Sequence, residues 1–282
     1  MRLSVFRVLC GVFAASLLWT ALLQNPAAVH AADPPVKPLK ALLVLGGCCH
    51  DYEAQKDILK DGISARAHVE ITIAYDPDKT TKHLNPVYEN PDWAAGYDVI
   101  IHDECTADVK DLDIIERILA PHRQGLPAVV LHCGMHCYRS EGFPNVTPWF
   151  QFTGLQTTGH GPQTPIDIKF VDPQNPITAG MENWTTINEE LYNNSAGKLL
   201  ETATPLALGH QISKNKKGEE VEAENVLIWT NTFEDKTKVF GTTLGHNNAT
   251  VSDPRYLDLV TRGLLWSCGQ LNETYLKTPA SK

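Results

Sequence analysis

Residues 126–136 read LPAVVLHCGMH, an apolar run that leads directly into polar and small residues. The apolar part predicts a buried strand, and the residues after it predict a sharp turn and the start of a helix. A turn from a strand into a helix is a standard place for an enzyme to mount a nucleophile. Here the turn begins with His132 rather than serine or cysteine, and Cys133 and His136 follow it. The segment is therefore either an acid/base or metal site, or a packed turn.

Apolar strands alternate with helices throughout the first half of the chain. Strands are predicted at residues 41–47, 69–75, 97–102 and 126–131, and helices at residues 57–65 and 111–122. This order is typical of an α/β fold in which helices cover both faces of a mainly parallel sheet. In such sheets, ligands bind beyond the carboxyl ends of the strands.

The second half of the chain is less regular. Strands are predicted at residues 165–171, 206–212, 226–229 and 238–244, a charged hairpin tip or loop at 214–224, and an amphipathic helix at 254–268.

Both ends of the chain predict segments outside the folded domain. Residues 1–31 have the pattern of a signal peptide, because two arginines precede an apolar core and a small-residue cleavage site ends it. An uncleaved N-terminal anchor is the alternative. We expect a linker over residues 32–37, one domain over 38–270, a tail over 271–282, and a protein exported to the periplasm or secreted.

Composition excludes some classes of partner. The formal net charge is −9 and no basic stripe is present, so nucleic acid is not an expected partner. A neutral small-molecule saccharide is compatible with this charge, and a homo-oligomer stays open. Six cysteines follow residue 31. Cys48 and Cys49 are neighbours, which rarely bond to each other, and structural cysteines are favoured over catalytic ones.

Histidines follow several of the predicted strands. His50 and His132 lie at strand ends, His246 follows the strand at 238–244, and His160 lies between two glycines. For these four we favour a functional cleft over core packing, whereas we expect His136 to point into helix packing. Core packing is also the expectation for the remaining candidates, His83, His102 and His122.

Two kinds of chemistry suit these histidines. His132, His160 and His246, with a carboxylate such as Glu190, would bind zinc or another divalent metal. Without a metal, the same groups would act as general acid and base. The sequence contains no G-x-S-x-G, P-loop or G-x-G-x-x-G motif.

Several segments resemble the ThuA-like (trehalose-utilisation) family. They are LLVLGG with His50-Asp51, YDVIIHDE, VVLHCGMH, FTGLQTTGHGP, NEELYN, VFGTTLGHNN and DPRYLDLVTRGLLWSCG. The resemblance implies a flavodoxin-like, class I glutamine amidotransferase-like three-layer sandwich. Against the amidotransferase elbow, His132 falls on the nucleophilic cysteine and Cys133 is one position off. His246 falls near the catalytic histidine and Asn248 near its acidic partner, so a glutaminase is not expected.

The resemblance also implies a role in the catabolism of trehalose or related disaccharides through 3-keto sugars. The expected reaction is isomerisation or cleavage of a keto sugar or glycoside. His132, His160, His246 and Glu190 would be the catalytic residues. The expected substrate-binding residues are His50, Asp51, Tyr192 and Asn247. Trp149 is a further stacking candidate, although core packing is favoured for it. The alternatives are a non-catalytic sugar-binding or scaffolding module and, less favoured, an amidotransferase-like hydrolase that uses Cys133.

Overall fold

The structure is a computed structural model that describes residues 36–155, 157–194 and 199–277. The predicted signal peptide of residues 1–31 and most of the predicted linker lie outside the described residues. Within the described residues, no helix is both long and apolar enough to span a bilayer.

A single nine-stranded sheet forms the centre of the described domain. Its strands are β1 (Leu39–Gly47), β2 (Val69–Asp76), β3 (Val99–Cys105), β4 (Ala128–Leu131), β5 (Thr164–Phe170), β6 (Trp184–Glu189), β7 (Ala203–Lys214), β8 (Glu220–Phe233) and β9 (Thr237–Thr242). Their order across the sheet is β2-β1-β3-β4-β9-β8-β7-β5-β6.

The sheet is mixed rather than mainly parallel, which corrects the sequence-based prediction. The pairs from β2 to β9 are parallel, whereas the pairs from β9 to β6 are antiparallel. The difference follows the burial of the strands. β1 is buried along almost its whole length, as a parallel strand covered on both faces should be. In β5, Ile166 and Ile168 are buried between more exposed neighbours, so one face of that strand is solvated.

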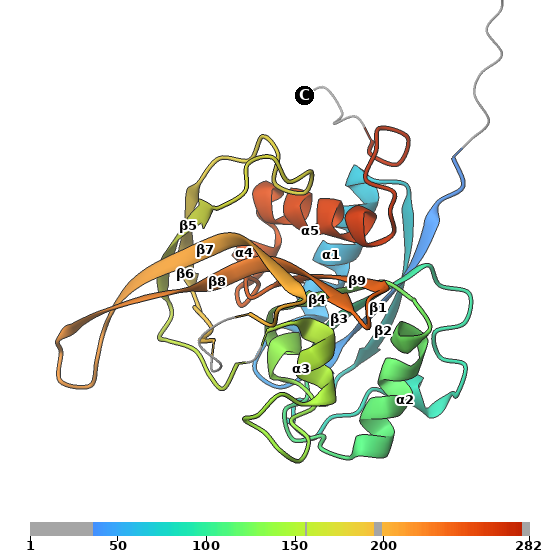
Figure 1. Cartoon of the computed structure of the whole chain (residues 1–282), viewed down its shortest axis with the longest axis horizontal. Helices are drawn as coiled ribbons and strands as arrows, with labels where there is room; N and C mark the ends of the chain where they lie inside the picture. The colour runs from blue at the N-terminus through green and yellow to red at the C-terminus, as the bar shows by residue number, and fades with distance from the viewer. Residues whose placement is uncertain (1–35, 156, 195–198, 278–282) are drawn as a thin grey trace, which may run out of the picture. The chain divides into compact units, whose positions relative to one another are not determined.

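Helices cover both faces of the parallel half (Figure 1). The helices are α1 (Tyr52–Arg66), α2 (Leu112–Arg123), α3 (Pro148–Thr153), α4 (Asn248–Val251) and α5 (Pro254–Ser267), with 3-10 turns η1 (Pro86–Glu89) and η2 (His132–His136). α1 and α5 lie on one face, and α2 and α3 on the other. Leu43 and Leu45 belong to the core under α1 and α5, whereas Leu42 and Val44 belong to the second core. This alternation along one strand gives the expected three layers.

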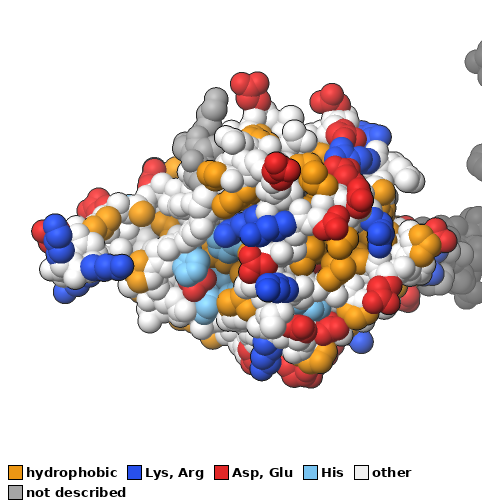
Figure 2. Space-filling view, turned by 90° about the horizontal axis from the view of Figure 1, so that it is seen from below, with side chains coloured by type: hydrophobic (Ala, Val, Ile, Leu, Met, Phe, Trp, Pro, Cys, Tyr) orange, Lys and Arg blue, Asp and Glu red, His pale blue; other side chains and the backbone are white. Residues whose placement is uncertain are grey.

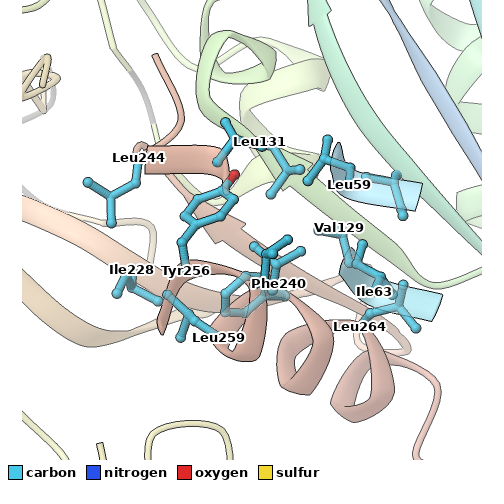
Figure 3. Close-up of a cluster of buried hydrophobic side chains, with 14 of the residues drawn as sticks. Leu59, Ile63, Val129, Leu131, Ile228, Phe240, Leu244, Tyr256, Leu259 and Leu264 are labelled. Carbon is cyan, nitrogen blue, oxygen red and sulfur yellow. The ribbon is translucent and has the colours of Figure 1, made fainter. Parts of the chain in front are cut away.

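The core under α5 shows how the helix is fixed to the sheet (Figure 3). Leu259 and Leu264 of α5 pack with Val129 of β4 and Phe240 of β9, and all four are fully buried. Asp253 caps the start of α5, since its side chain accepts a hydrogen bond from the backbone N–H of Arg255.

Several segments differ from the sequence-based expectations. Strand β6 and helix α3 lie where no element was predicted. The predicted charged loop at 214–224 is shorter, because β7 and β8 extend into a long hairpin that projects from the sheet. The described part of the predicted tail is not loose. Leu276 pairs with Ala67, and the backbone N–H of Lys277 donates to the carbonyl of Arg66.

Candidate active site

Four chain segments bring the candidate site together at one edge of the sheet. His50 follows β1, His132 follows β4 and His246 follows β9 by a few residues. These three strands are parallel, so their carboxyl ends share one edge. Glu190 comes directly after β6 and reaches the same place from the antiparallel half.

Glu190 is the centre of the cluster. Its carboxylate oxygens lie 3.6 Å from Nε2 of His132, 3.6 Å from Nε2 of His160 and 3.2 Å from Nδ1 of His246. Glu190 is buried, with 6% of its surface exposed. Three imidazole rings therefore surround one carboxylate.

Three of the histidines also converge on one another. One ring nitrogen from each of His50, His132 and His246 lies within 4.8 Å of the others. The ring centroids of His50 and His132 are 4.6 Å apart, and those of His50 and His246 are 4.8 Å apart. The predicted cleft histidines thus do meet in space.

The backbone at His132 forms the elbow that lifts its ring into the site. His132 has φ of 38°, a left-handed conformation that non-glycine residues rarely adopt and that is enriched at functional sites. At Gly134, a Cβ atom would lie 2.7 Å from Cγ1 of Val130, so only glycine allows the turn to pack so closely.

Hydrogen bonds fix which nitrogen of His132 carries its proton. Nδ1 lies 2.6 Å from the carbonyl oxygen of Thr243, and a carbonyl only accepts, so Nδ1 is the donor. In the neutral ring, Nε2 therefore carries a lone pair that can accept from the hydroxyl of Tyr192, 3.2 Å away, whereas a proton on Nε2 would face Glu190 at 3.6 Å. His160 is arranged in the same way, since its Nδ1 donates to the carbonyl of Gly161 at 2.8 Å.

A cavity of about 240 Å³ that opens to solvent is lined by His50, His160, Glu190 and His246, whereas His132 is 1% exposed and is not part of this lining. Figure 2 shows this face, on which histidine side chains gather beside an acidic one. His160 has 39% of its side chain exposed and is the most accessible of the rings around Glu190.

The sequence of the chain agrees with one known family over most of its length. The family model described as ThuA, trehalose utilisation, matches residues 40–267. The chain belongs to the ThuA family. A comparison with curated proteins finds no match.

Two solved structures of ThuA-like proteins share the fold. The protein from Parabacteroides merdae has a TM-score of 0.58 and 19% identity, over 82% of this chain and 90% of that one. The protein from Bacteroides uniformis has a TM-score of 0.56 and 13% identity, over 85% of this chain and 96% of that one. At these identities the likeness shows the fold alone.

Electrostatics distinguish the members of this ThuA-family site. Burial would raise the pKa of Glu190, but contacts with His132 and His246 outweigh burial and hold the pKa below its usual range. The pKa of His50 is lowered to about 2, because burial disfavours its charged form and His132 and His246 lie beside it. Contact with Glu190 raises the pKa of His246. The site thus holds an ionised carboxylate beside a neutral His50 ring.

Two of the expected substrate-binding residues lie outside the cavity. The side chain of Asp51 accepts hydrogen bonds from the backbone N–H of Ala54, at the start of α1, and from Nδ2 of Asn248. Asn247 donates from its side chain to the carbonyl of Asn188 at 2.7 Å. Both are thus engaged in joining loops. Trp149 is fully buried, as favoured, and donates to the carbonyl of Gly134.

Tyr192 lines the cavity but is 1% exposed. Its ring packs against the ring of His136 at 4.2 Å between centroids and against that of His160 at 5.4 Å. The prediction that His136 points into helix packing is therefore wrong. The segment is a five-residue 3-10 turn rather than the start of an α-helix, so His136 is not stacked in a helical face and lines the cavity instead.

The structure also differs from the expectation for the neighbouring cysteines. Cys48 and Cys49 form a disulfide, contrary to the expectation for neighbours. Cys49 has φ of 83°, in the left-handed region. Cys133 is a free thiol, 4% exposed, and burial raises its pKa well above the usual value. It is thus not prepared as a nucleophile.

Sequence reasoning missed two supporting residues. Gln163 donates from Nε2 to Glu190 and lies 2.7 Å from Nε2 of His246. Glu189 accepts hydrogen bonds from the backbone N–H groups of His246 and Asn247 and so fixes the loop that carries His246. The pair Glu189-Glu190 in the sequence could have indicated a role for Glu189, whereas nothing in the sequence singles out Gln163.

Proposed function

We propose that this ThuA-family protein is an exported enzyme that isomerises or cleaves a 3-keto sugar derived from trehalose or a related disaccharide. The observation that carries the proposal is the buried Glu190 carboxylate with ring nitrogens of three histidines within 3.6 Å. The family's association with trehalose utilisation supplies the substrate class.

The chemistry of a 3-keto sugar suits this cluster. A carbonyl acidifies the hydrogen on the neighbouring carbon, so one base can remove it and one acid can protonate the leaving glycosidic oxygen. The lone pair at Nε2 of His132 is available as a base, and the ionised carboxylate of Glu190 balances the positive charge that the ring gains with the proton. His160, at the open side of the cavity, is placed to meet the substrate first. A divalent cation that polarises the carbonyl would serve the same reaction.

The binding surface differs from the one expected from the sequence. His136 and His160 occupy the neighbourhood of the Tyr192 ring, so this ring supports the site rather than offering a free face to a sugar. The Tyr192 hydroxyl, 3.2 Å from Nε2 of His132, positions that histidine.

The experiment is turnover of a 3-keto disaccharide by the wild-type protein and by the double variant His132→Ala with His160→Ala. We expect the double variant to lose at least about 100-fold in kcat/KM, the scale of a lost acid/base group. His210→Ala is the matched control, because His210 also contacts a glutamate, Glu222 at 3.7 Å, but lies on β7 outside the cluster. Wild-type activity in the double variant would contradict the proposal. Saccharide binding without turnover, unaffected by loss of His132, would favour a binding module.

Export has its own test. We expect the N-terminal sequence of the protein recovered outside the cytoplasm to begin at Ala32. A protein that stays in the cytoplasm with residues 1–31 attached would contradict this part of the proposal.

A further inference from the structure

We propose that His50, His132 and His246 bind one divalent transition-metal ion of the zinc class, and that Glu190 beside them balances its charge. This inference deepens the proposed function and rests on it for the reaction that the metal would assist. The ligand set differs from the one expected from the sequence, because His50 takes the place of His160.

Three histidine rings converge on one place in the site. Acid/base chemistry uses one or two histidines, whereas here ring nitrogens from three separate strand ends lie within 4.8 Å of one another. Catalytic zinc usually has three protein ligands and one open position, and three imidazoles are one of the known sets.

The hydrogen bonds of the ring nitrogens also suit metal binding. Metal-binding histidines usually donate their other ring N–H to a carbonyl, which fixes the ring and leaves a lone pair for the metal. His132 is held in this way by Thr243. In His50, Nδ1 is buried and has no hydrogen-bond partner within the described part of the chain. A buried polar atom without a partner is costly, and coordination would satisfy it.

The charge beside the histidines favours a cation. Glu190 supplies a negative charge within 3.6 Å of the His132 and His246 rings. A divalent cation among neutral imidazoles would be compensated by this carboxylate. Nitrogen donors with one carboxylate suit zinc, nickel or iron better than calcium or magnesium, which take oxygen ligands.

Two neighbouring sulfur clusters are weaker candidates for the same ion. Cys48 and Cys49 approach Cys105, but their sulfur atoms are joined in a disulfide and supply no thiolates. Cys105 and Cys133 approach His50, but both are buried free thiols.

His160 is assigned to the substrate side. Its Nε2 lies 3.6 Å from Glu190, yet it does not share the close approach of the other three rings. Its exposed side chain leaves it free to contact a bound sugar.

The test is calorimetric titration of zinc chloride into chelator-treated protein. We expect one saturable site per chain. His132→Ala and His50→Ala should each weaken zinc binding by at least about 100-fold. This exceeds the usual loss when a residue is removed that only hydrogen-bonds a metal ligand. His160→Ala and the control His210→Ala should stay within about threefold of the wild type. Circular dichroism shows which variants are folded. His50→Ala and His132→Ala alter different strand ends, so if one of them does not fold, the zinc affinity of the other still tests the site.

Three results would overturn the inference. They are no saturable zinc binding by the wild type, equal loss in His210→Ala and His132→Ala, or equal loss in His160→Ala and His132→Ala. Failure here is distinguishable from failure of the proposed function. Keto-sugar turnover that persists in chelator without zinc binding would remove the metal and keep the reaction. Zinc binding without turnover would keep the metal site and remove the substrate class.

Discussion

Gly47 shows how closely the end of β1 approaches β3 beside the site. It has φ of 95°, and a Cβ atom built there would collide with the backbone carbonyl of Cys105. Backbone atoms cannot move aside as a flexible side chain can. The approach therefore allows no side chain, and Cys48 after β1 lies next to Cys105, the last residue of β3, with 3.4 Å between their sulfur atoms.

Gly47→Ala should accordingly destabilise the fold. We expect a loss of about 2–4 kcal/mol in the free energy of unfolding, from overpacking plus the strained φ. Gly218→Ala is the matched control, because Gly218 has φ of 83° but open space around it. It should cost about 1 kcal/mol through φ alone. Urea unfolding of both variants measures the difference, and equal losses would contradict the collision.

Cys133 provides a second prediction for a single residue. Because its thiol is 4% exposed, iodoacetamide should leave Cys133 unmodified in the folded protein. After unfolding in urea under non-reducing conditions, mass spectrometry should find Cys133 alkylated. Rapid alkylation of the folded protein with loss of activity would instead support the hydrolase alternative.

Among the helices, α5 is anchored to the sheet by its buried face. Leu264 is fully buried between the helix and the sheet. Leu264→Ala should lower the free energy of unfolding by about 2–5 kcal/mol, through lost burial and a cavity. Leu112→Ala, on α2 where Leu112 is 44% exposed, should change it by about 0.5 kcal/mol or less. Similar losses in the two variants would show that α5 is not anchored as described.

The elements that could be predicted are those with an uninterrupted pattern. β4 is a continuous apolar run, β1 is one apart from Lys40, and β3 begins with three apolar residues, Val99 to Ile101. α5 repeats leucines and valine on one face. β6 reads WTTINE, and its burial does not alternate, so neither strand nor helix periodicity is visible. The pairing of β5 with β7 passes over β6 in the sequence and could not be inferred from local pattern, whereas short turns join β7 to β8 and β8 to β9.

For the whole molecule, a buried polar network on the α2 side should set the acid limit of stability. Nδ1 of His102 lies 2.9 Å from Glu104, and Nε2 of His102 lies 3.1 Å from Nε2 of His122. Burial, together with neighbouring His102, lowers the pKa of His122 to about 3 from 6.5. Between these values the unfolded chain binds a proton at His122 that the folded chain does not. Folding stability should therefore fall as the pH drops from 6.5 toward 3.

His122→Asn tests this contribution, because asparagine can donate to the carbonyl of Leu126 but does not titrate. In the wild type His122 should add about 1 kcal/mol of stability loss per pH unit in this window. The plot of unfolding free energy against pH between 4 and 6 should be shallower in the variant by that amount. Parallel plots would contradict a neutral buried His122.

The site forms where strand ends from distant parts of the chain meet. His50, His132 and His246 could be predicted together, because the carboxyl ends of parallel strands share one edge. Asp51 and Asn247 have the right residue types, but their side chains are used by nearby backbone and amide groups. Such local competition cannot be read from spacing. His136 was misassigned for a related reason, since a 3-10 turn changes which side chains face the cavity.

Catalysis by the histidines around Glu190 is tested most directly by kcat/KM for a 3-keto disaccharide in Glu190→Gln, compared with Glu182→Gln. Glutamine keeps the shape of Glu190 but removes the charge around which the histidines gather, whereas Glu182 is exposed and lies outside the cavity. We expect a loss of at least about 100-fold in Glu190→Gln and wild-type values in Glu182→Gln. A folded Glu190→Gln variant within threefold of the wild type would contradict it.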